Sequence, residues 1–448
     1  MPHDLARLTD DLLRAARAAG ADAADALAVS GASVSTEVRG GALEHAERSE
    51  GTELGLRVLI GRRQASVAAS DLRPESLAAM AERAVAMARV APEDPHVGLA
   101  SADAVARNWD TAALDLADPA DPPGPAELER AAAEAEAAAL AVPGVSQTLS
   151  SSAGTDRRDV WLAATNGFAG GYTRTLRYLS CGAIVGSGTA MERDYASEMR
   201  SHWADLPDPA EVGRLAGERT AARAGARRAR TGPCPVIYDE RVAGSLIGHL
   251  LVAINGGSVA RGASWARDML GHAVLPAGLS LVEEPHRPRA PGSRPFDAEG
   301  LPTRARSIVE DGVLTGWILD LATGRKLGME STANAVRTPG SVPHPSSGNV
   351  TLTPGDVGRD ALMAEAGRGL LITSLIGSTI NPNTGDYSRG ASGFWFEGGE
   401  IVHPVSEITV AGNLIDMLRS LRPANDARPH LSRVVPSLLV EGLTLAGD

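Results

Sequence analysis

Helical and strand-like segments alternate along the first hundred residues of the chain. Residues 5–19 have the apolar spacing of an amphipathic helix and end at Gly20. A second helical pattern covers 74–90. Between the two helices lie three strand-like runs, at 26–30, 33–40 and 54–61. This order predicts an N-terminal α/β domain over 1–100, in which a sheet carries helices on one face.

The region 101–230 is predicted to be a linker and middle region. It opens with a segment rich in Asp, Pro and Ala and continues into an Ala/Glu-rich helix at 126–141. Alternating polar and apolar residues then favour strands between 144 and 204, and another helix is expected at 209–229. Four arginines near the end of that helix fit the helix dipole, or alternatively a patch for an acidic partner.

The C-terminal half, 231–448, is predicted to be a β-rich domain with a few helices. A short buried strand at 235–238 is followed by Asp239, a plausible N-cap for a helix over 241–254. Asp311-Gly312 is a strong hairpin turn signal, and further strands are expected over 370–410. The complete pattern predicts an α+β fold.

Charge and composition exclude several classes of function. The formal net charge is -12 and aromatic residues make up only 3%, which disfavours nucleic-acid binding because that depends on cations and stacking. No apolar run approaches the roughly 18 residues of a membrane helix, and no secretory signal is visible. Cys181 and Cys234 do not form a disulfide framework. We therefore expect a cytoplasmic protein without membrane or nucleic-acid partners.

Searches for common catalytic motifs find none. The chain lacks a GxSxG nucleophile elbow, a GxxxxGK[ST] phosphate loop and a GxGxxG run between a strand and a helix. The two cysteines also lack the spacing of a thiolate metal site.

The segment 381–400 has more polar and glycine residues than a structural element needs. Short polar side chains between glycines allow the backbone to approach a ligand or a partner closely, although a loop that satisfies its own hydrogen bonds would look the same. The candidate contact residues are Asn381, Asn383, Asp386, Ser388, Arg389 and Ser392. Lys326 joins them because it is the only lysine in the chain, although one lysine can also survive by chance.

The helix over 241–254 carries the one histidine that we single out. Ser245 and His249 are four residues apart and therefore share a face of this helix. His249 could act chemically or bind a ligand, but a histidine on such a helix is more often a hydrogen-bonded residue of the core or its rim.

Several long segments resemble the TldD/PmbA family, once called modulators of DNA gyrase. The run NPNTGDYSRGASGFWFEGGEIVHPVSEITVAGNLIDML is similar to the family's C-terminal signature. The segments GLRVLIGRRQASVAASDL, IVEDGVLTGWILDLATGRKLG and GSLIGHLLVAINGGS also match. The resemblance therefore covers nearly the whole chain.

The resemblance implies a metallopeptidase relative without its metal site. In the TldD branch a helix carries an HExxxH zinc motif, and here Gly244, Ser245 and His249 stand at its three functional positions. Zinc needs about three protein ligands and a base to activate water, so the resemblance implies that this chain binds no metal. It is similar to the PmbA branch, also called TldE. That branch implies a non-catalytic subunit paired with a zinc-bearing TldD-like subunit in proteolysis of unfolded peptides.

Other functions remain open from the sequence alone. The main alternative is a stand-alone peptide-binding or chaperone-like homodimer. A third is an enzyme that combines His249 with Asp386, Ser388 and Arg389, and a fourth is direct action on a topoisomerase, which rests only on the family's older name. For peptide recognition we expect an extended segment to add to a strand edge.

Overall fold

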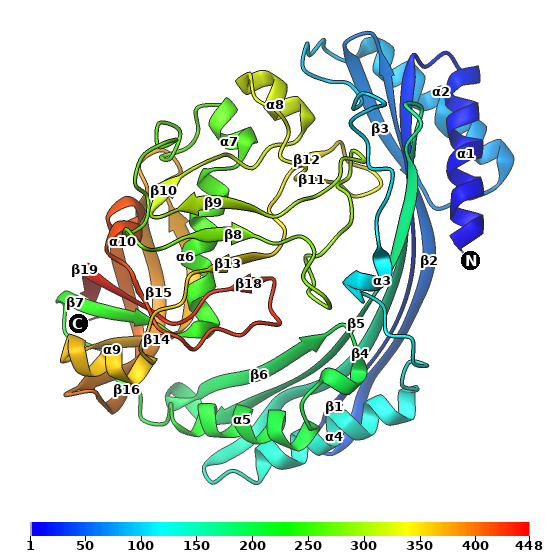
Figure 1. The fold of residues 1–448 in the computed structure, drawn as a ribbon. Coiled ribbons are helices and arrows are strands. Elements are labelled where there is room, and N and C mark those ends of the chain that lie inside the picture. Colours follow the sequence, from blue (N-terminus) through cyan, green and yellow to red (C-terminus); the bar gives the residue numbers. More distant parts are fainter. Residues whose placement is uncertain (1, 448) are drawn as a thin grey trace.

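A long, curved sheet forms one side of the molecule and wraps around a second body (Figure 1). The computed structural model describes residues 2–447, with side chains from Asp4 onward. The sheet is antiparallel throughout, in the order β3-β2-β1-β4-β5-β6. Its strands are β1 (Ala23–Arg39), β2 (Ala42–Ile60), β3 (Arg63–Ala69), β4 (Val145–Ala164), β5 (Ala169–Val185) and β6 (Glu192–Arg200). Strands from 101–230 therefore complete the same sheet as those from 1–100.

The prediction of two separate strands at 26–30 and 33–40 was wrong, because both runs belong to β1. Gly31 pairs with Gly51 of β2 on one side and with Arg158 of β4 on the other, so the ladder continues through the expected break. A central strand bonded along both edges has no need of a turn there.

Four helices cover the convex outer face of this sheet (Figure 1). They are α1 (Pro2–Ala18), α2 (Pro74–Val90), α4 (Pro125–Leu140) and α5 (Pro209–Ala221). Because side chains alternate along a strand, Ala24 and Ala26 of β1 pack under α1 and α2, whereas Leu27 belongs to a different core on the concave face. The first three helices confirm the sequence predictions. The fourth ends earlier than expected, a few residues before Gly225 adopts a φ of 73°.

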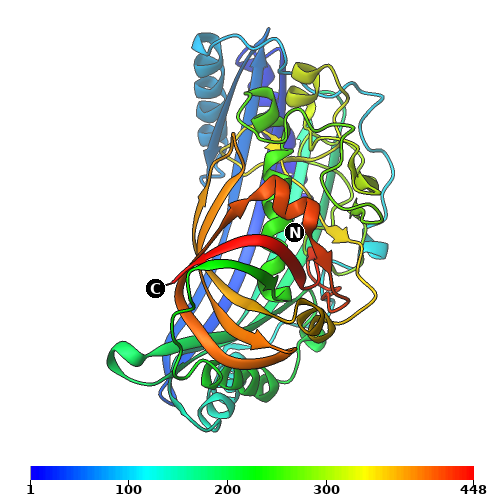
Figure 2. The same cartoon turned by 90° about the vertical axis from the view of Figure 1, so that its left-hand side faces the viewer.

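The second body contains two further sheets, seen in front of the long strands in Figure 2. One has the order β16-β15-β14-β7-β19-β17, and a further pairing of β16 with β19 closes five of these strands into a ring. Its strands are β7 (Gly232–Tyr238), β14 (Arg368–Ile380), β15 (Asp386–Glu397), β16 (Glu400–Asn413), β17 (Arg422–Pro423) and β19 (Leu438–Ala446). The other sheet consists of β8 (Leu281–Glu283), β9 (Arg306–Glu310), β10 (Val313–Leu314), β13 (Val350–Leu352) and β18 (Arg433–Val434).

The helix α6 (Glu240–Ala253) crosses the core between these two sheets. Its Leu246, Ile247 and Leu250 are buried with residues from β7, β9, β13, β14 and β19. The side chain of Asp239 accepts a hydrogen bond from the amide of Arg241, which confirms the predicted N-cap. The shorter elements are α3 (Thr111–Leu114), α7 (Gly256–Ala260), α8 (Leu321–Leu327), α9 (Arg359–Ala366), α10 (Leu414–Ser420), the hairpin of β11 (Ala335–Val336) and β12 (His344–Pro345), and the 3₁₀ turns η1 (Gly188–Ala190) and η2 (Trp203–Asp205).

The hairpin predicted at Asp311-Gly312 joins β9 to β10, and both turn residues have positive φ. The α+β class is therefore confirmed, with sheets as the larger component. None of the helices within residues 2–447 has the length and apolarity needed to cross a bilayer.

Candidate functional site

Two polar residues of α6 face away from the apolar core. Ser245 and His249 lie one helical turn apart, and neither Ser245 Oγ nor His249 Nε2 has a hydrogen-bond partner within residues 2–447, although both atoms are shielded from solvent. The His249 ring stands edge-on to Tyr387 of β15, with 5.9 Å between ring centroids. Buried polar atoms without partners are costly, so these two atoms mark the α6 face as unusual.

An arginine lies across this same face of α6. Arg433 of β18 packs over Gly248, where an added Cβ would lie 2.8 Å from its guanidinium Nη1. One turn earlier, a Cβ added at Gly244 would be 3.9 Å from Arg433 Cβ. The helix therefore presents glycine at two positions where the arginine side chain passes.

Two positively charged side chains, those of Arg389 and Arg433, lie near His249. Burial, followed by the positive charges of Arg389 and Arg433, lowers the pKa of His249 to about 4. The imidazole is therefore neutral at pH 7. Neither arginine forms an ion pair with a carboxylate anywhere in residues 2–447, although the chain has more acidic than basic side chains.

The residues on this face do not fit a bound metal ion. They offer one imidazole and one hydroxyl, and the adjacent guanidinium groups repel a divalent cation. No group of three His, Cys, Asp or Glu side chains suited to a metal occurs in the described part of the chain. Burial raises the pKa of both Cys181 and Cys234 to about 11, which keeps these thiols protonated and poor as ligands.

The polar segment 381–400 is a turn only as far as Gly385. From Asp386 onward it is the strand β15, bonded to β14 and β16 on its two edges. Its glycines serve packing: a Cβ added at Gly393 would overlap the carbonyl oxygen of Leu371 on the neighbouring strand. Gly393 therefore reflects close strand pairing, whereas Gly385 has a φ of 79° in the turn before the strand.

The turn at the start of this segment satisfies its own hydrogen bonds. The side chain of Asn381 accepts from the amide of Asn383 at 3.0 Å. Asp386 accepts from Thr384 Oγ1 at 2.6 Å and from Asn413 Nδ2 at 3.2 Å, and Asn413 also caps α10. These contacts fasten the turn to α10.

The structure separates the remaining candidates. Arg389 lies on the same face of β15 as Tyr387, near His249, and its Nε donates to the carbonyl of Gly377 at 2.7 Å. Ser388 alternates to the other face of the strand. Ser392 is buried in the middle of β15 and accepts a hydrogen bond from Arg223, one of the four arginines near the end of the helix predicted at 209–229. Lys326 is exposed in the last turn of α8. Of all these residues, only Arg389 is brought to His249.

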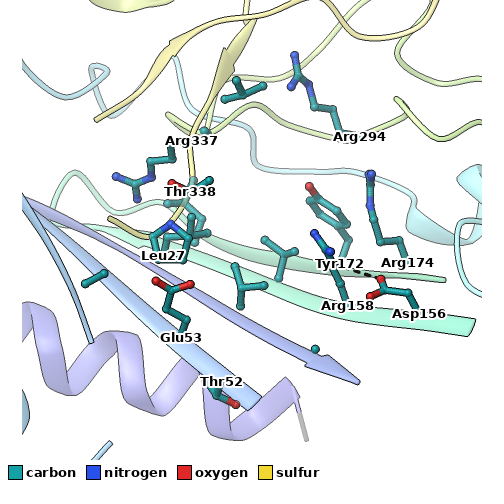
Figure 3. A pocket seen from close by; sticks show the side chains of 18 of the residues that line it. Leu27, Thr52, Glu53, Asp156, Arg158, Tyr172, Arg174, Arg294, Arg337 and Thr338 are labelled. Carbon is teal, nitrogen blue, oxygen red and sulfur yellow. Dashed lines mark ion pairs between the residues drawn. The ribbon is translucent and has the colours of Figure 1, made fainter. Parts of the chain in front are cut away.

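The main cavity lies between the concave face of the long sheet and the second body, and has a volume of about 1120 Å³. Figure 3 shows Leu27 and Tyr172 on the sheet side of the cavity, with Arg337 and Thr338 of the segment after β11 opposite them. A space of this size exceeds the usual range for small-molecule pockets, about 300–1,000 Å³, and suits a segment of peptide.

The charged lining of this cavity contains both signs, with four arginines and the four carboxylates of Glu50, Glu53, Asp156 and Asp297. Arg174 stacks over Tyr172, 5.3 Å from the ring centroid, and donates to the carbonyls of Pro291 and Ser293 in the second body. Arg158 pairs with Asp156 at 3.2 Å (Figure 3). The cavity thus combines aromatic, apolar, cationic and anionic surfaces.

Sequence reasoning missed most of these residues. Arg433 lies 184 positions beyond His249 in the chain. Tyr172 and Arg174 lie on β5, but Arg174 reaches the second body through the carbonyls of Pro291 and Ser293, which are more than a hundred residues away in sequence. The sequence signal that could have pointed to Arg433 is weak: an arginine precedes two valines in the run SRVV.

Family models match three successive parts of the chain. They describe domain 1, the central domain and the C-terminal domain of a PmbA/TldA metallopeptidase, over residues 24–88, 118–224 and 231–447 respectively. The solved structures that resemble this fold include a protein of Bacteroides thetaiotaomicron described as a modulator of DNA gyrase. It has a TM-score of 0.90 and 27% identity, with 99% of this chain and 98% of that chain covered. TldE from Thermococcus kodakarensis shares the fold, with a TM-score of 0.85, 18% identity and coverage of 98% and 99%.

Two relatives match over nearly their whole lengths. The metalloprotease PmbA of Escherichia coli O157:H7 is 36% identical, covering 93% of this chain and 90% of its own. The PmbA homologue of Haemophilus influenzae is 34% identical, covering 96% and 93%. Together with the three domain matches, these similarities show that the chain belongs to the PmbA/TldD metallopeptidase family.

Proposed function

We propose that this chain is the non-catalytic, PmbA/TldE-like subunit of a heterodimeric TldD/TldE-type metalloprotease that acts on unfolded peptides. The observation that carries the proposal is the α6 face, where the family resemblance places Gly244, Ser245 and His249 at the positions of the zinc motif and where Arg433 lies across Gly244 and Gly248. In this proposal the partner subunit supplies the zinc and the activated water, and this chain binds no cofactor.

The contribution of this chain is to hold and guide the peptide. The cavity of about 1120 Å³ is large enough for an extended segment and lies against long strands. Within residues 2–447, no strand pairs with the outer edge of β2 over residues 42–53, since β3 pairs only from Leu54 onward, which supports recognition by strand addition. Contacts of Asn381, Asn383, Asp386, Ser388, Arg389, Ser392 and Lys326 with substrate or partner remain predictions, as does a location in the cytoplasm.

Co-purification with an HExxxH-bearing homologue tests this function. We expect the two chains to elute as one complex that hydrolyses a denatured peptide. The amount of zinc in this complex should match the amount of the homologue and not the total amount of both chains. Each chain should also be measured by itself, and this chain should show neither stoichiometric zinc nor hydrolysis. Separate elution together with full activity of the homologue alone would refute the subunit role.

The alternative is a stand-alone peptide-binding or chaperone-like homodimer. The observation that favours it is that the long sheet and the second body of this one chain both line the cavity. In the same experiment this alternative predicts a homodimer that does not exchange with the homologue and that slows aggregation of an unfolded protein on its own.

A further inference from the structure

The α6 face contains two kinds of polar group that lack partners. Ser245 Oγ and His249 Nε2 are buried without partners, and the guanidinium groups of Arg389 and Arg433 nearby have no carboxylate within residues 2–447. Arg433 is exposed and Arg389 is half-buried, with its Nε bonded to the Gly377 carbonyl, so both guanidinium groups keep donors free for a ligand from solvent. A single anion at the α6 face would satisfy donors of both kinds.

We propose that this face, the counterpart of the family's zinc site, binds a carboxylate group of a peptide. The guanidinium of Arg433 can hold a carboxylate through two parallel hydrogen bonds. The Ser245 hydroxyl can donate a third, and His249 a fourth when its proton is on Nε2. The choice of a peptide as the ligand rests on the proposed function, whereas the binding of a carboxylate rests on the residues alone.

The site also explains why the face does not suit a metal. Cationic side chains that attract a carboxylate repel zinc, so these residues favour an anionic ligand over a metal ion. Val252, three residues beyond His249 on the exposed side of α6, is 64% exposed and offers an apolar contact for a neighbouring peptide side chain. A peptide terminus would therefore be held at this face while the rest of the segment leads away.

The carboxylate could come from a peptide C-terminus or from an acidic side chain, and three probes separate these sources. They are N-acetyl-Ala-Ala with a free C-terminus, the same dipeptide as its amide, and N-acetyl-Asp-Ala amide. Binding to the isolated full chain is measured by calorimetry and by the NMR signals of His249. We expect the first probe to bind, the amide to bind at least about tenfold more weakly, and bound carboxylate to raise the pKa of His249. Tighter binding of the Asp probe would assign the site to acidic side chains.

Two variants and a control test the residues. Arg433→Gln should weaken binding of the free-terminus probe by about tenfold or more, and Ser245→Ala by several-fold. Arg62→Gln removes the same charge from the exposed turn between β2 and β3 and should leave binding unchanged. Thermal unfolding of each variant shows whether the chain is folded.

Equal binding of the acid and the amide, or an unaltered affinity in folded Arg433→Gln, would overturn the proposal. Because these measurements use the isolated chain, their outcome is independent of complex formation. A complex that forms and cleaves peptide while the carboxylate probes fail to bind would refute this inference and leave the proposed function standing.

Discussion

At the scale of single residues, Glu299 is the most unusual acid in the chain. Burial, followed by repulsion from the neighbouring Asp297, raises the pKa of Glu299 to about 8, from an ordinary value of 4.5. Its Oε2 accepts a hydrogen bond from the amide of Leu321 at 2.8 Å. The folded chain therefore keeps a proton on Glu299 that the unfolded chain releases.

This difference makes stability depend on pH. Between about pH 4.5 and pH 8 the folded state binds more protons than the unfolded state, so the free energy of unfolding falls as the pH rises. Glu299→Gln keeps an oxygen acceptor and removes the titration. We expect this variant to lose less stability than the wild type between pH 5 and pH 9, by on the order of 2 kcal/mol. Chemical denaturation across that range measures the difference.

Glu310→Gln is the matched control, because Glu310 is exposed at the end of β9. Its pH curve should run parallel to that of the wild type, and a parallel curve for Glu299→Gln would contradict the explanation. Nothing in the local sequence distinguishes these two glutamates. The difference arises from residues that the fold brings around Glu299, such as Arg57 and Asp320.

At the scale of elements, α5 packs on α4 through glycine. A Cβ at Gly213 would overlap the carbonyl oxygen of Ala135, and one at Gly217 would lie 2.8 Å from the carbonyl oxygen of Ala139. Alanine normally stabilises a helix relative to glycine, by about 1 kcal/mol. At Gly213 we expect the opposite, a loss of about 1–3 kcal/mol in Gly213→Ala, because the helices must move apart. Thermal unfolding measures the change.

Gly244→Ala is the comparison within the same chain. Gly244 lies in α6, where a Cβ would meet only Arg433 Cβ at an ordinary 3.9 Å. This variant should be neutral or slightly stabilised. If both alanine variants behaved alike, close approach of α4 and α5 would not be the reason for Gly213.

The sequence predicts elements best where their signals are local. The N-cap at Asp239 and the turn at Asp311-Gly312 were recognised because the residues that form them are neighbours in the chain. The continuity of β1 through Gly31 was missed, because its pairing with the distant strand β4 carries the ladder through that residue. Strands were expected over 370–410, but the polar and glycine-rich composition after Asn381 obscured the start of β15 at Asp386. Resemblance to the family supplied His249 as a site position, but the arginines around it come from other strands.

At the scale of the whole molecule, buried ion pairs join the long sheet to the second body. Asp25 of β1 bonds Arg57 of β2 through Nε at 2.8 Å, and it also bonds Arg337, which follows β11. All three side chains are almost fully buried. Next to them, a Cβ at Gly55 would overlap the carbonyl oxygen of Pro339, so the two bodies are in close backbone contact.

Removing the shared carboxylate should therefore weaken the contact between the long sheet and the second body. Asp25→Asn leaves two buried guanidinium groups without an anion, and we expect it to cost about 3–5 kcal/mol of unfolding free energy. Arg337→Met should cost less, because Asp25 keeps Arg57. Glu365→Gln breaks a half-exposed pair with Arg422, 2.6 Å apart, and should cost under about 1 kcal/mol. Denaturant unfolding gives all three values. If Asp25→Asn were no more costly than Glu365→Gln, hydrophobic and backbone contacts alone would hold the long sheet against the second body, and the cavity between them would not depend on this carboxylate.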